Sequence, residues 1–259
     1  MDKDILNLSI VQANTIQYDV VGNLAHLEEI LEQDCSPESD IIVLPEMFNT
    51  GFHVEPKKYA EAMGLQTSRW LKLQATRLNK AICGTFAVAE NGKYYNRFIF
   101  QLPSGQYFQY DKHHLFTYGK EGEVFTPGQE KIIINYLGWN IRPAICYEVR
   151  FPEWCRNTKD FEYDLLLVCA NWPSVRSNAW RNLLPARAIE NSSYLVAVNR
   201  SGPDGTGIIY DGGSAAYNPE GIALVNPTIE NEAVLEVTLD KTYLNNYRTQ
   251  FKVHSDWEI

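Results

Sequence analysis

The sequence lacks the features that would connect the protein to a membrane or to nucleic acid. It has no uninterrupted apolar run near the ~20 residues that a membrane-spanning helix needs. Its first twelve residues contain no basic segment, long apolar core or small-residue cleavage site of the signal-peptide kind. The formal net charge is −9, and no basic face is concentrated anywhere. These absences favour small-molecule chemistry, and we expect a cytoplasmic protein.

Paired cysteines and metal-ligand spacing are also missing. The five cysteines are an odd number in a chain of 259 residues, and no CxxC pair occurs, so we do not expect a disulfide framework. Of the five histidines, only His113 and His114 are adjacent. This spacing is not that of a zinc site. We therefore expect neither a metal ion nor an organic cofactor.

About a dozen apolar runs, rich in β-branched and aromatic residues, predict strands that alternate with helices. The turn pairs Asn91-Gly92 and Ser104-Gly105 predict antiparallel hairpins between Ile82 and Tyr110. The pattern favours an α/β fold with mixed sheets. Helical periodicity places helices at Val20–Gln33, Ser68–Leu78, Pro152–Asn157 and Asn178–Asn191.

The chain shows no linker that would divide it. With 45% hydrophobic residues it is long enough for one large α/β domain or two small ones. Low-complexity segments, charge blocks and internal repeats are absent from the sequence. We therefore predict a single domain, residues 1–259, and keep as the alternative two domains divided near residue 130.

Two charged residues follow predicted strands. Glu46 ends the run DIIVLPE, at the carboxyl edge of a strand where α/β folds place their sites, and Pro45 makes the position rigid. Lys112 follows the strand YFQYD. Taken alone, each is more typical of a solvated charge at the end of a strand.

A stronger local pattern surrounds Cys146. An apolar strand runs into this residue and stops at a polar turn before Pro152, which is typical of the first position of a helix. A strand-turn-helix arrangement exposes a nucleophile at the edge of a sheet, with backbone N–H groups facing the same space. The alternative is a buried structural cysteine.

Three segments, in this order, resemble the signature regions of the carbon–nitrogen hydrolase (nitrilase) superfamily: LPEMFNTGF, DKHHLF…GKEGEVFTPG and AICYEVRFPEW. The segment ANWPSVR…LLPARAIENSSYLVAVNRSG is similar as well, so the resemblance extends from Ile10 to about Val237. It implies a four-layer α-β-β-α sandwich of two mixed sheets. It also implies a homodimer formed through the helix after the nucleophile, which would begin at FPEW.

The resemblance implies a catalytic triad. Glu46 is the expected general base, Lys112 the cation that stabilises the oxyanion, and Cys146 the nucleophile that forms a thioester. The backbone N–H of Tyr147 is the second expected oxyanion donor. Because a neighbouring ammonium lowers the pKa of a thiol, we expect Lys112 to favour the thiolate of Cys146 or to assist its formation.

Four further acids belong to the same interpretation. The family places a substrate-orienting glutamate at Glu121, with Glu123 as a competitor in the same loop. Glu190 matches a supporting acid that we expect to brace the loop near Lys112. Glu148 departs from many members, which carry Asp at this position.

The variants HHLF, CYEVRFPEW and ANWP are closest to the omega-amidase branch, which deamidates 2-oxo-dicarboxylic acid monoamides such as 2-oxoglutaramate and 2-oxosuccinamate. We therefore expect a small-molecule amide substrate, released as acid and ammonia. A substrate carboxylate calls for donors such as arginine. The cationic candidates are Arg150, Arg176, Arg187 and Arg200, of which we select the first two, and the aromatic candidates are Phe48, Phe116, Tyr147 and Trp172, of which we select Phe116 and Trp172.

Other functions remain open at this stage. An N-carbamoyl hydrolase or a deaminated-peptide amidase would use the same triad on a larger substrate, and hydrolysis of a nitrile is less favoured because true nitrilases tend to be longer. A catalytically silent interaction protein on the same fold is the non-enzyme alternative. It would have no reason to keep all three triad positions filled.

Overall fold

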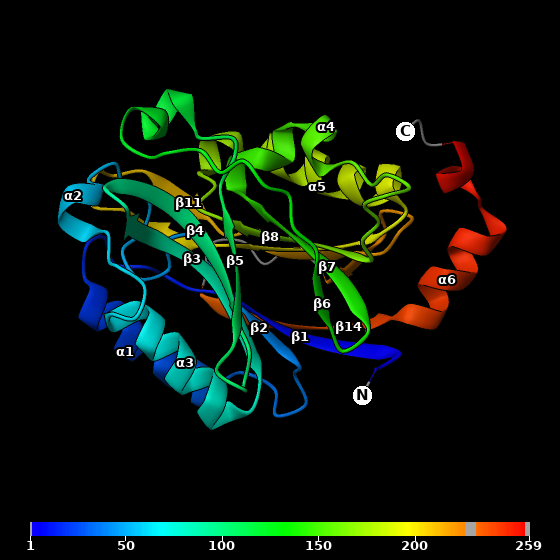
Figure 1. Ribbon diagram of the computed structural model, residues 1–259, viewed down its shortest axis with the longest axis horizontal. Coiled ribbons are helices and arrows are strands. Elements are labelled where there is room, and N and C mark those ends of the chain that lie inside the picture. Colours follow the sequence, from blue (N-terminus) through cyan, green and yellow to red (C-terminus); the bar gives the residue numbers. More distant parts are fainter. Residues whose placement is uncertain (1, 226–231, 257–259) are drawn as a thin grey trace.

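Two six-stranded sheets form the centre of the molecule (Figure 1). The computed structural model describes residues 2–225 and 232–256. The first sheet has the order β14-β1-β2-β3-β4-β5 and the second β13-β12-β9-β8-β7-β6. The strands of the first sheet are β1 (Ile5–Gln12), β2 (Ile41–Val43), β3 (Ala81–Glu90), β4 (Lys93–Gln101), β5 (Tyr107–Asp111) and β14 (Ala233–Asp240). Those of the second are β6 (Ile134–Tyr136), β7 (Trp139–Ile145), β8 (Leu165–Ala170), β9 (Tyr194–Asn199), β12 (Ala215–Tyr217) and β13 (Ala223–Val225).

Helices cover the outer face of each sheet. On the first sheet, α1 (Val20–Gln33) and α3 (Gln66–Leu78) bury Leu27 and Leu71 against strand residues. On the second, α4 (Pro152–Cys155) and α5 (Ser177–Asn191) bury Cys155 and Leu184. Figure 1 shows α1 and α3 on one side of the paired sheets, and α4 and α5 on the other. The predicted four-layer sandwich is confirmed.

The inner faces of the two sheets share one apolar core. It includes Leu8 and Phe98 of the first sheet and Trp139, Leu167 and Val196 of the second, all fully buried. Burial of apolar side chains on this scale is the main term that favours folding. The relative position of the two sheets is therefore set by packing between them.

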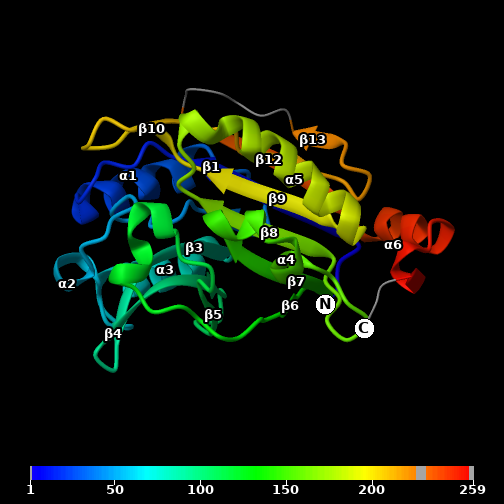
Figure 2. The same cartoon turned by 90° about the horizontal axis from the view of Figure 1, so that it is seen from above.

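Both sheets are mixed. In the first, β1, β2 and β3 run parallel, while the β3–β4 and β4–β5 pairs are antiparallel. The β3–β4 turn has positive φ at Asn91 and Gly92 (51° and 74°), as a two-residue hairpin requires, and Gly105 has φ 88° before β5. Both predicted hairpins are confirmed. In the second sheet, β7, β8 and β9 are parallel (Figure 2).

Some elements differ from the expectation. The helix predicted at Pro152–Asn157 ends at Cys155, and α2 (Pro56–Tyr59), α6 (Lys241–Gln250) and the strand pair β10 (Ser201–Pro203) and β11 (Ile209–Asp211) were not predicted. In α6 the buried residues are Leu244 and Arg248, so its apolar periodicity is weak. GIALVN, one of the apolar runs that predict strands, contains β13, but its Asn226 lies outside the described residues. Among the helices described, none has the length and apolar character needed to span a membrane.

Candidate active site

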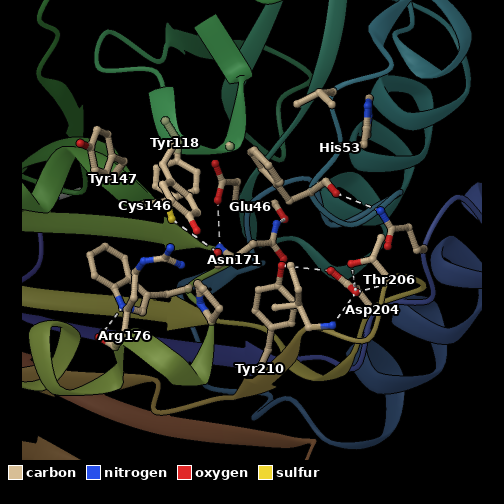
Figure 3. Close-up of a pocket in the computed structure, with 18 of the residues that line it drawn as sticks. Glu46, His53, Tyr118, Cys146, Tyr147, Asn171, Arg176, Asp204, Thr206 and Tyr210 are labelled. Carbon is tan, nitrogen blue, oxygen red and sulfur yellow. Dashed lines mark hydrogen bonds between the residues drawn. The ribbon is translucent and has the colours of Figure 1, made fainter.

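Strand ends of the two sheets bring Glu46, Lys112 and Cys146 into one pocket. Figure 3 labels Glu46 and Cys146 in this pocket. Glu46 follows β2 and Lys112 follows β5, so both come from the first sheet. Cys146 follows β7 of the second sheet. The three residues predicted as a triad therefore meet where the two sheets adjoin.

Cys146 sits on a sharp turn. Its backbone φ is 47°, a conformation that residues other than glycine rarely adopt, and it begins a 3₁₀ turn that extends to Arg150. Backbone strain of this kind costs of order 1–3 kcal/mol and is concentrated at functional sites. The thiol donates a hydrogen bond from Sγ to the carbonyl oxygen of Asn171, at 3.7 Å. This is the strand-turn arrangement that the sequence predicted.

Lys112 is buried between two carboxylates. Its Nζ lies 2.8 Å from Oε1 of Glu46 and 2.9 Å from Oε2 of Glu121. Burial alone would lower the pKa of Lys112, but the negative charges of Glu121 and Glu46 outweigh burial and raise it above its usual value. Glu123, the competitor in the same loop, is exposed. The structure thus places Glu121, not Glu123, beside the lysine.

Both oxygens of the Glu46 carboxylate accept hydrogen bonds. Oε1 accepts from Lys112 Nζ and from Asn96 Nδ2, both at 2.8 Å, and Oε2 accepts from the backbone N–H of Asn171 at 2.9 Å. Asn96 also donates to Glu121 at 2.9 Å, while Asn171 Nδ2 donates to the Glu46 carbonyl at 2.6 Å. The carboxylate is held in one orientation.

The sequence interpretation did not single out either asparagine. Asn171 lies in ANWP, a segment that entered only through the resemblance. Asn96 is a buried polar residue within β4, and nothing in its local pattern separates it from an outward-facing position.

The surroundings of Cys146 raise the pKa of its thiol. Burial and the negative charge of Glu46 raise its pKa well above the usual value, and Lys112 lowers it by less. Lys112 lowers the pKa of the thiol, in the direction expected of a neighbouring ammonium, but burial and the carboxylate have the larger effect. A base has to remove the thiol proton before sulfur can act as a nucleophile.

A cavity of about 290 Å³ opens above these groups. In Figure 3, Cys146, Tyr147 and Arg176 lie on one side of the view, and Asp204 and Thr206 lie on the other. The aromatic and cationic residues selected from the sequence, Phe116, Trp172, Arg150 and Arg176, all line the cavity, and so does Tyr147. These residues give the cavity an apolar wall with two guanidinium groups.

Neither guanidinium has an acidic partner among the described residues. Arg150 lies over the ring of Trp172, at 4.8 Å from the centroid. Arg176 lies over Tyr118 at 4.8 Å and over Phe116 at 5.4 Å. Contacts with aromatic rings hold these cations without neutralising them. The pocket can therefore receive a ligand that carries a carboxylate.

The other candidates from the sequence lie elsewhere. Arg187 donates from Nε to the Val149 carbonyl at 2.9 Å, and Arg200 donates from Nη2 to the Thr15 carbonyl at 2.7 Å. Both arginines are buried and hold backbone segments. Phe48 packs in the core on the outer side of the first sheet. None of the three is among the residues that line the cavity.

The opposite rim of the cavity was missed by the sequence interpretation. Gln17 bridges two loops there, because its Nε2 donates to the Phe52 carbonyl at 3.1 Å and its Oε1 accepts from Gly205 N–H at 2.9 Å. Asp204 accepts from the backbone N–H of Thr206 at 2.8 Å, which fixes the same turn. These residues follow no strand with a recognisable motif, so only the folded chain brings them to the site.

Glu190 does not have the position that we expected. It pairs with Arg187 at 2.9 Å, next to the turn after Cys146, and the loop after Lys112 is held instead by Glu148. Oε1 of Glu148 accepts from His113 N–H at 2.8 Å. The expectation that Glu190 braces the Lys112 loop is therefore wrong, because α5 carries it to the nucleophile side.

The chain matches the family model of the carbon–nitrogen hydrolases over residues 7–249. The omega-amidase YafV of Escherichia coli strain K12 is 36% identical, over 97% of this chain and 96% of its own length. The 2-oxoglutaramate amidase of Bacillus subtilis strain 168 is 30% identical, over 90% of each chain.

Solved structures give the same result. A CN-hydrolase superfamily protein of Xanthomonas campestris, which carries an arsenic adduct in its active site, superposes with a TM-score of 0.96 at 38% identity, covering 99% of this chain and 98% of its own. Nit3 of Saccharomyces cerevisiae, a nitrilase superfamily member, superposes with a TM-score of 0.84 at 22% identity, covering 96% and 94%. At 22% identity, the similarity to Nit3 concerns the fold alone.

Proposed function

Because the chain belongs to the carbon–nitrogen hydrolase family, we propose that its pocket hydrolyses 2-oxo-dicarboxylic acid monoamides to the acid and ammonia, as an omega-amidase does. One observation carries the proposal: Cys146 and the buried Glu46–Lys112 pair line a cavity whose wall bears two cations, Arg150 and Arg176, without acidic partners among the described residues. The relatives named as omega-amidase and 2-oxoglutaramate amidase support this substrate class.

In the first half of the reaction, Glu46 accepts the thiol proton of Cys146, and Sγ attacks the carbonyl carbon of the amide. The carbonyl oxygen becomes an oxyanion, which the Lys112 ammonium and the Tyr147 backbone N–H stabilise. Each donor of this kind contributes roughly 2.7–4 kcal/mol in comparable sites. Glu46 then gives its proton to the nitrogen, the C–N bond breaks, and ammonia departs. The acyl group remains bound to Cys146 as a thioester.

In the second half, a water molecule gives a proton to Glu46 while its oxygen attacks the thioester carbon. The C–S bond breaks, the acid is released, and the sulfur of Cys146 recovers its proton from Glu46. Glu121 supports both halves, since its carboxylate holds Lys112 Nζ at 2.9 Å and accepts from Phe116 N–H at 2.6 Å. No step in this scheme requires a metal ion or an organic cofactor.

Recognition of the substrate uses the cationic side of the cavity. The distal carboxylate of a dicarboxylic acid monoamide forms charge-assisted hydrogen bonds with Arg176 or Arg150. The apolar chain between carboxylate and amide lies against Phe116 and Trp172, which line the same cavity. A neutral amide of equal length lacks the charged contact and binds more weakly.

The proposal also covers the domain organisation, the location in the cell and the oligomeric state of the protein. We propose one domain over residues 1–259, because both sheets share one core. Five free cysteines agree with a cytoplasmic location. We also propose a homodimer through the segment that begins at Pro152, although α4 itself is short. Sedimentation equilibrium at micromolar concentration tests the dimer, and a monomeric mass would exclude it.

The first experiment measures ammonia release by the purified protein from 2-oxoglutaramate and 2-oxosuccinamate, against glutamine, asparagine and N-carbamoyl-β-alanine. We expect rapid turnover of the two oxo-amides and none in the Cys146→Ala variant. Ammonia release by Cys146→Ala would refute the thioester mechanism. Activity on the ureido acid alone would favour an N-carbamoyl hydrolase.

A further inference from the structure

A buried carboxylate behind the nucleophile turn has no role in the scheme above. Glu148 is fully buried and accepts four hydrogen bonds. Its Oε2 accepts from Ile145 N–H at 2.7 Å. Its Oε1 accepts from His113 N–H at 2.8 Å, from His114 N–H at 3.3 Å and from the Tyr110 hydroxyl at 2.5 Å.

These four donors belong to two segments that come from different sheets. Ile145 ends β7 and directly precedes Cys146, while Tyr110 lies in β5 and the two histidines directly follow Lys112. One side chain therefore bonds to the residue before the nucleophile and to the residue after the cation. The segments have no covalent link near the site, so their separation depends on such contacts.

We propose that Glu148 is a positioning residue, which fixes the distance between Sγ of Cys146 and Nζ of Lys112. This inference rests on the proposed roles of those two residues. It assigns to Glu148 no contact with substrate. Its effect is on the geometry in which the oxyanion meets the lysine, and misplacement of reacting groups by ~1 Å can reduce a rate by about two orders of magnitude.

The site requires a carboxylate rather than an amide. All four partners donate, and a second donor fixes the direction of one of them, since Trp154 Nε1 donates to the Tyr110 oxygen at 2.9 Å. An amide in place of Glu148 would turn its NH₂ group toward an N–H or O–H group, leaving both donors without an acceptor. Burial raises the pKa of Glu148, and the hydrogen bonds from Tyr110, Ile145 and His113, together with the charge of Lys112, oppose that effect only in part.

Ring contacts join the same two segments. His113 stacks on Trp154 with centroids 3.9 Å apart, and His114 stacks on Phe151 at 3.8 Å. Both aromatic partners lie in the region that follows the nucleophile turn. The stacking limits how far the segments can separate, while the directional bonds to Glu148 set how they align.

The test compares Glu148→Gln with Glu153→Gln, which makes the same change at an exposed glutamate of α4. With 2-oxoglutaramate as substrate, ammonia release is divided by the amount of folded protein, measured by near-ultraviolet circular dichroism, so that loss of folded protein does not count. We expect Glu148→Gln to lower kcat at least tenfold with KM within threefold of the parent. Glu153→Gln should keep both within twofold.

A purely structural role would lower the melting temperature and leave kcat per folded molecule unchanged. A parent-like kcat in Glu148→Gln, or a loss confined to KM, therefore overturns the proposal. Should Glu148→Gln fail to fold, Glu148→Asp decides: it keeps the charge but is one methylene too short to reach both segments. We expect a three- to tenfold lower kcat at constant KM, and a parent-like kcat would overturn the proposal.

The parallel Cys146→Ala variant separates this inference from the proposed function. If Cys146→Ala still releases ammonia, the proposed mechanism fails. If Cys146→Ala is inactive while Glu148→Gln matches the parent, only the positioning role fails.

Discussion

Two glutamates of one short loop have opposite environments. Glu121 is buried beside Lys112, whereas Glu123 is exposed. An amide at Glu121 would remove half of the negative charge that surrounds the lysine and would set an NH₂ group against the ammonium or the Phe116 N–H. We expect Glu121→Gln to lower kcat for 2-oxoglutaramate at least tenfold.

Glu123→Gln is the matched control for this prediction, because it makes the same change two residues after Glu121 in the same turn, at a side chain exposed to solvent. Its kcat should stay within twofold of the parent. Steady-state ammonia release from both variants measures kcat. Equal losses of kcat in Glu121→Gln and Glu123→Gln would contradict the different roles assigned to the two glutamates.

The resting thiol gives a second prediction at this scale. Since burial and Glu46 raise the pKa of Cys146 above the ordinary value of 9.0, its thiolate fraction should be small at pH 7 and should grow as pH rises. The rate of alkylation by iodoacetamide, followed by mass spectrometry of the peptide that contains Cys146, should still be increasing at pH 9. A plateau below pH 7 would mean a resting thiolate and would contradict the prediction.

Residues differ in how well the sequence identifies them. Glu46, Lys112 and Cys146 follow strands and stand in ordered motifs, so their positions were predictable. Asn96 and Gln17 act through hydrogen bonds to residues far along the chain, for which local pattern holds no signal. The expected position of Glu190 was wrong because a sequence motif specifies only which residues are neighbours along the chain. It does not specify the side of the site on which α5 places the Glu190 side chain.

At the scale of elements, side chains at the ends of a helix make measurable contributions to the free energy of unfolding. Asp19 caps α1, since its side chain accepts from Gly22 N–H at 2.9 Å, while Asp34 stands at the other end of the same helix. Loss of an N-cap carboxylate costs about 1 kcal/mol. A negative charge at a helix C-terminus opposes the dipole of the helix. Asp19→Ala should therefore destabilise the protein by about 1 kcal/mol.

Asp34→Ala provides the control, and it should leave the free energy of unfolding unchanged or slightly increased. Urea unfolding of both variants, with the same m-value, measures the difference. Equal destabilisation by the two substitutions would mean that α1 does not depend on its cap.

Elements were predictable where the pattern was long and regular. The boundaries of α1 matched, because a capping aspartate precedes an amphipathic run. The short pair β10 and β11 and the helix α6 were missed, since three-residue strands and a mostly polar helix carry little periodicity. Their position is set by the tertiary contacts that they make.

At the scale of the molecule, stability should depend on the core between the sheets. Leu167 of β8 is fully buried in it, whereas Leu73 of α3 is 60% exposed. Truncation of a buried leucine removes transfer energy and leaves a cavity, which together cost about 2–5 kcal/mol. We expect that loss for Leu167→Ala and less than about 0.5 kcal/mol for Leu73→Ala. Chemical denaturation measures both, and similar values would contradict the importance of the inner core.

The division of the site between the two sheets has a consequence for refolding. Glu46 and Lys112 belong to one sheet and Cys146 to the other, and β14, from the far end of the chain, completes the first sheet beside β1. A compact state that had formed its strands but not docked its sheets would give a native-like far-ultraviolet spectrum without turnover. Ammonia release thus reports the docking of the sheets, an event that spectroscopy of the backbone does not detect.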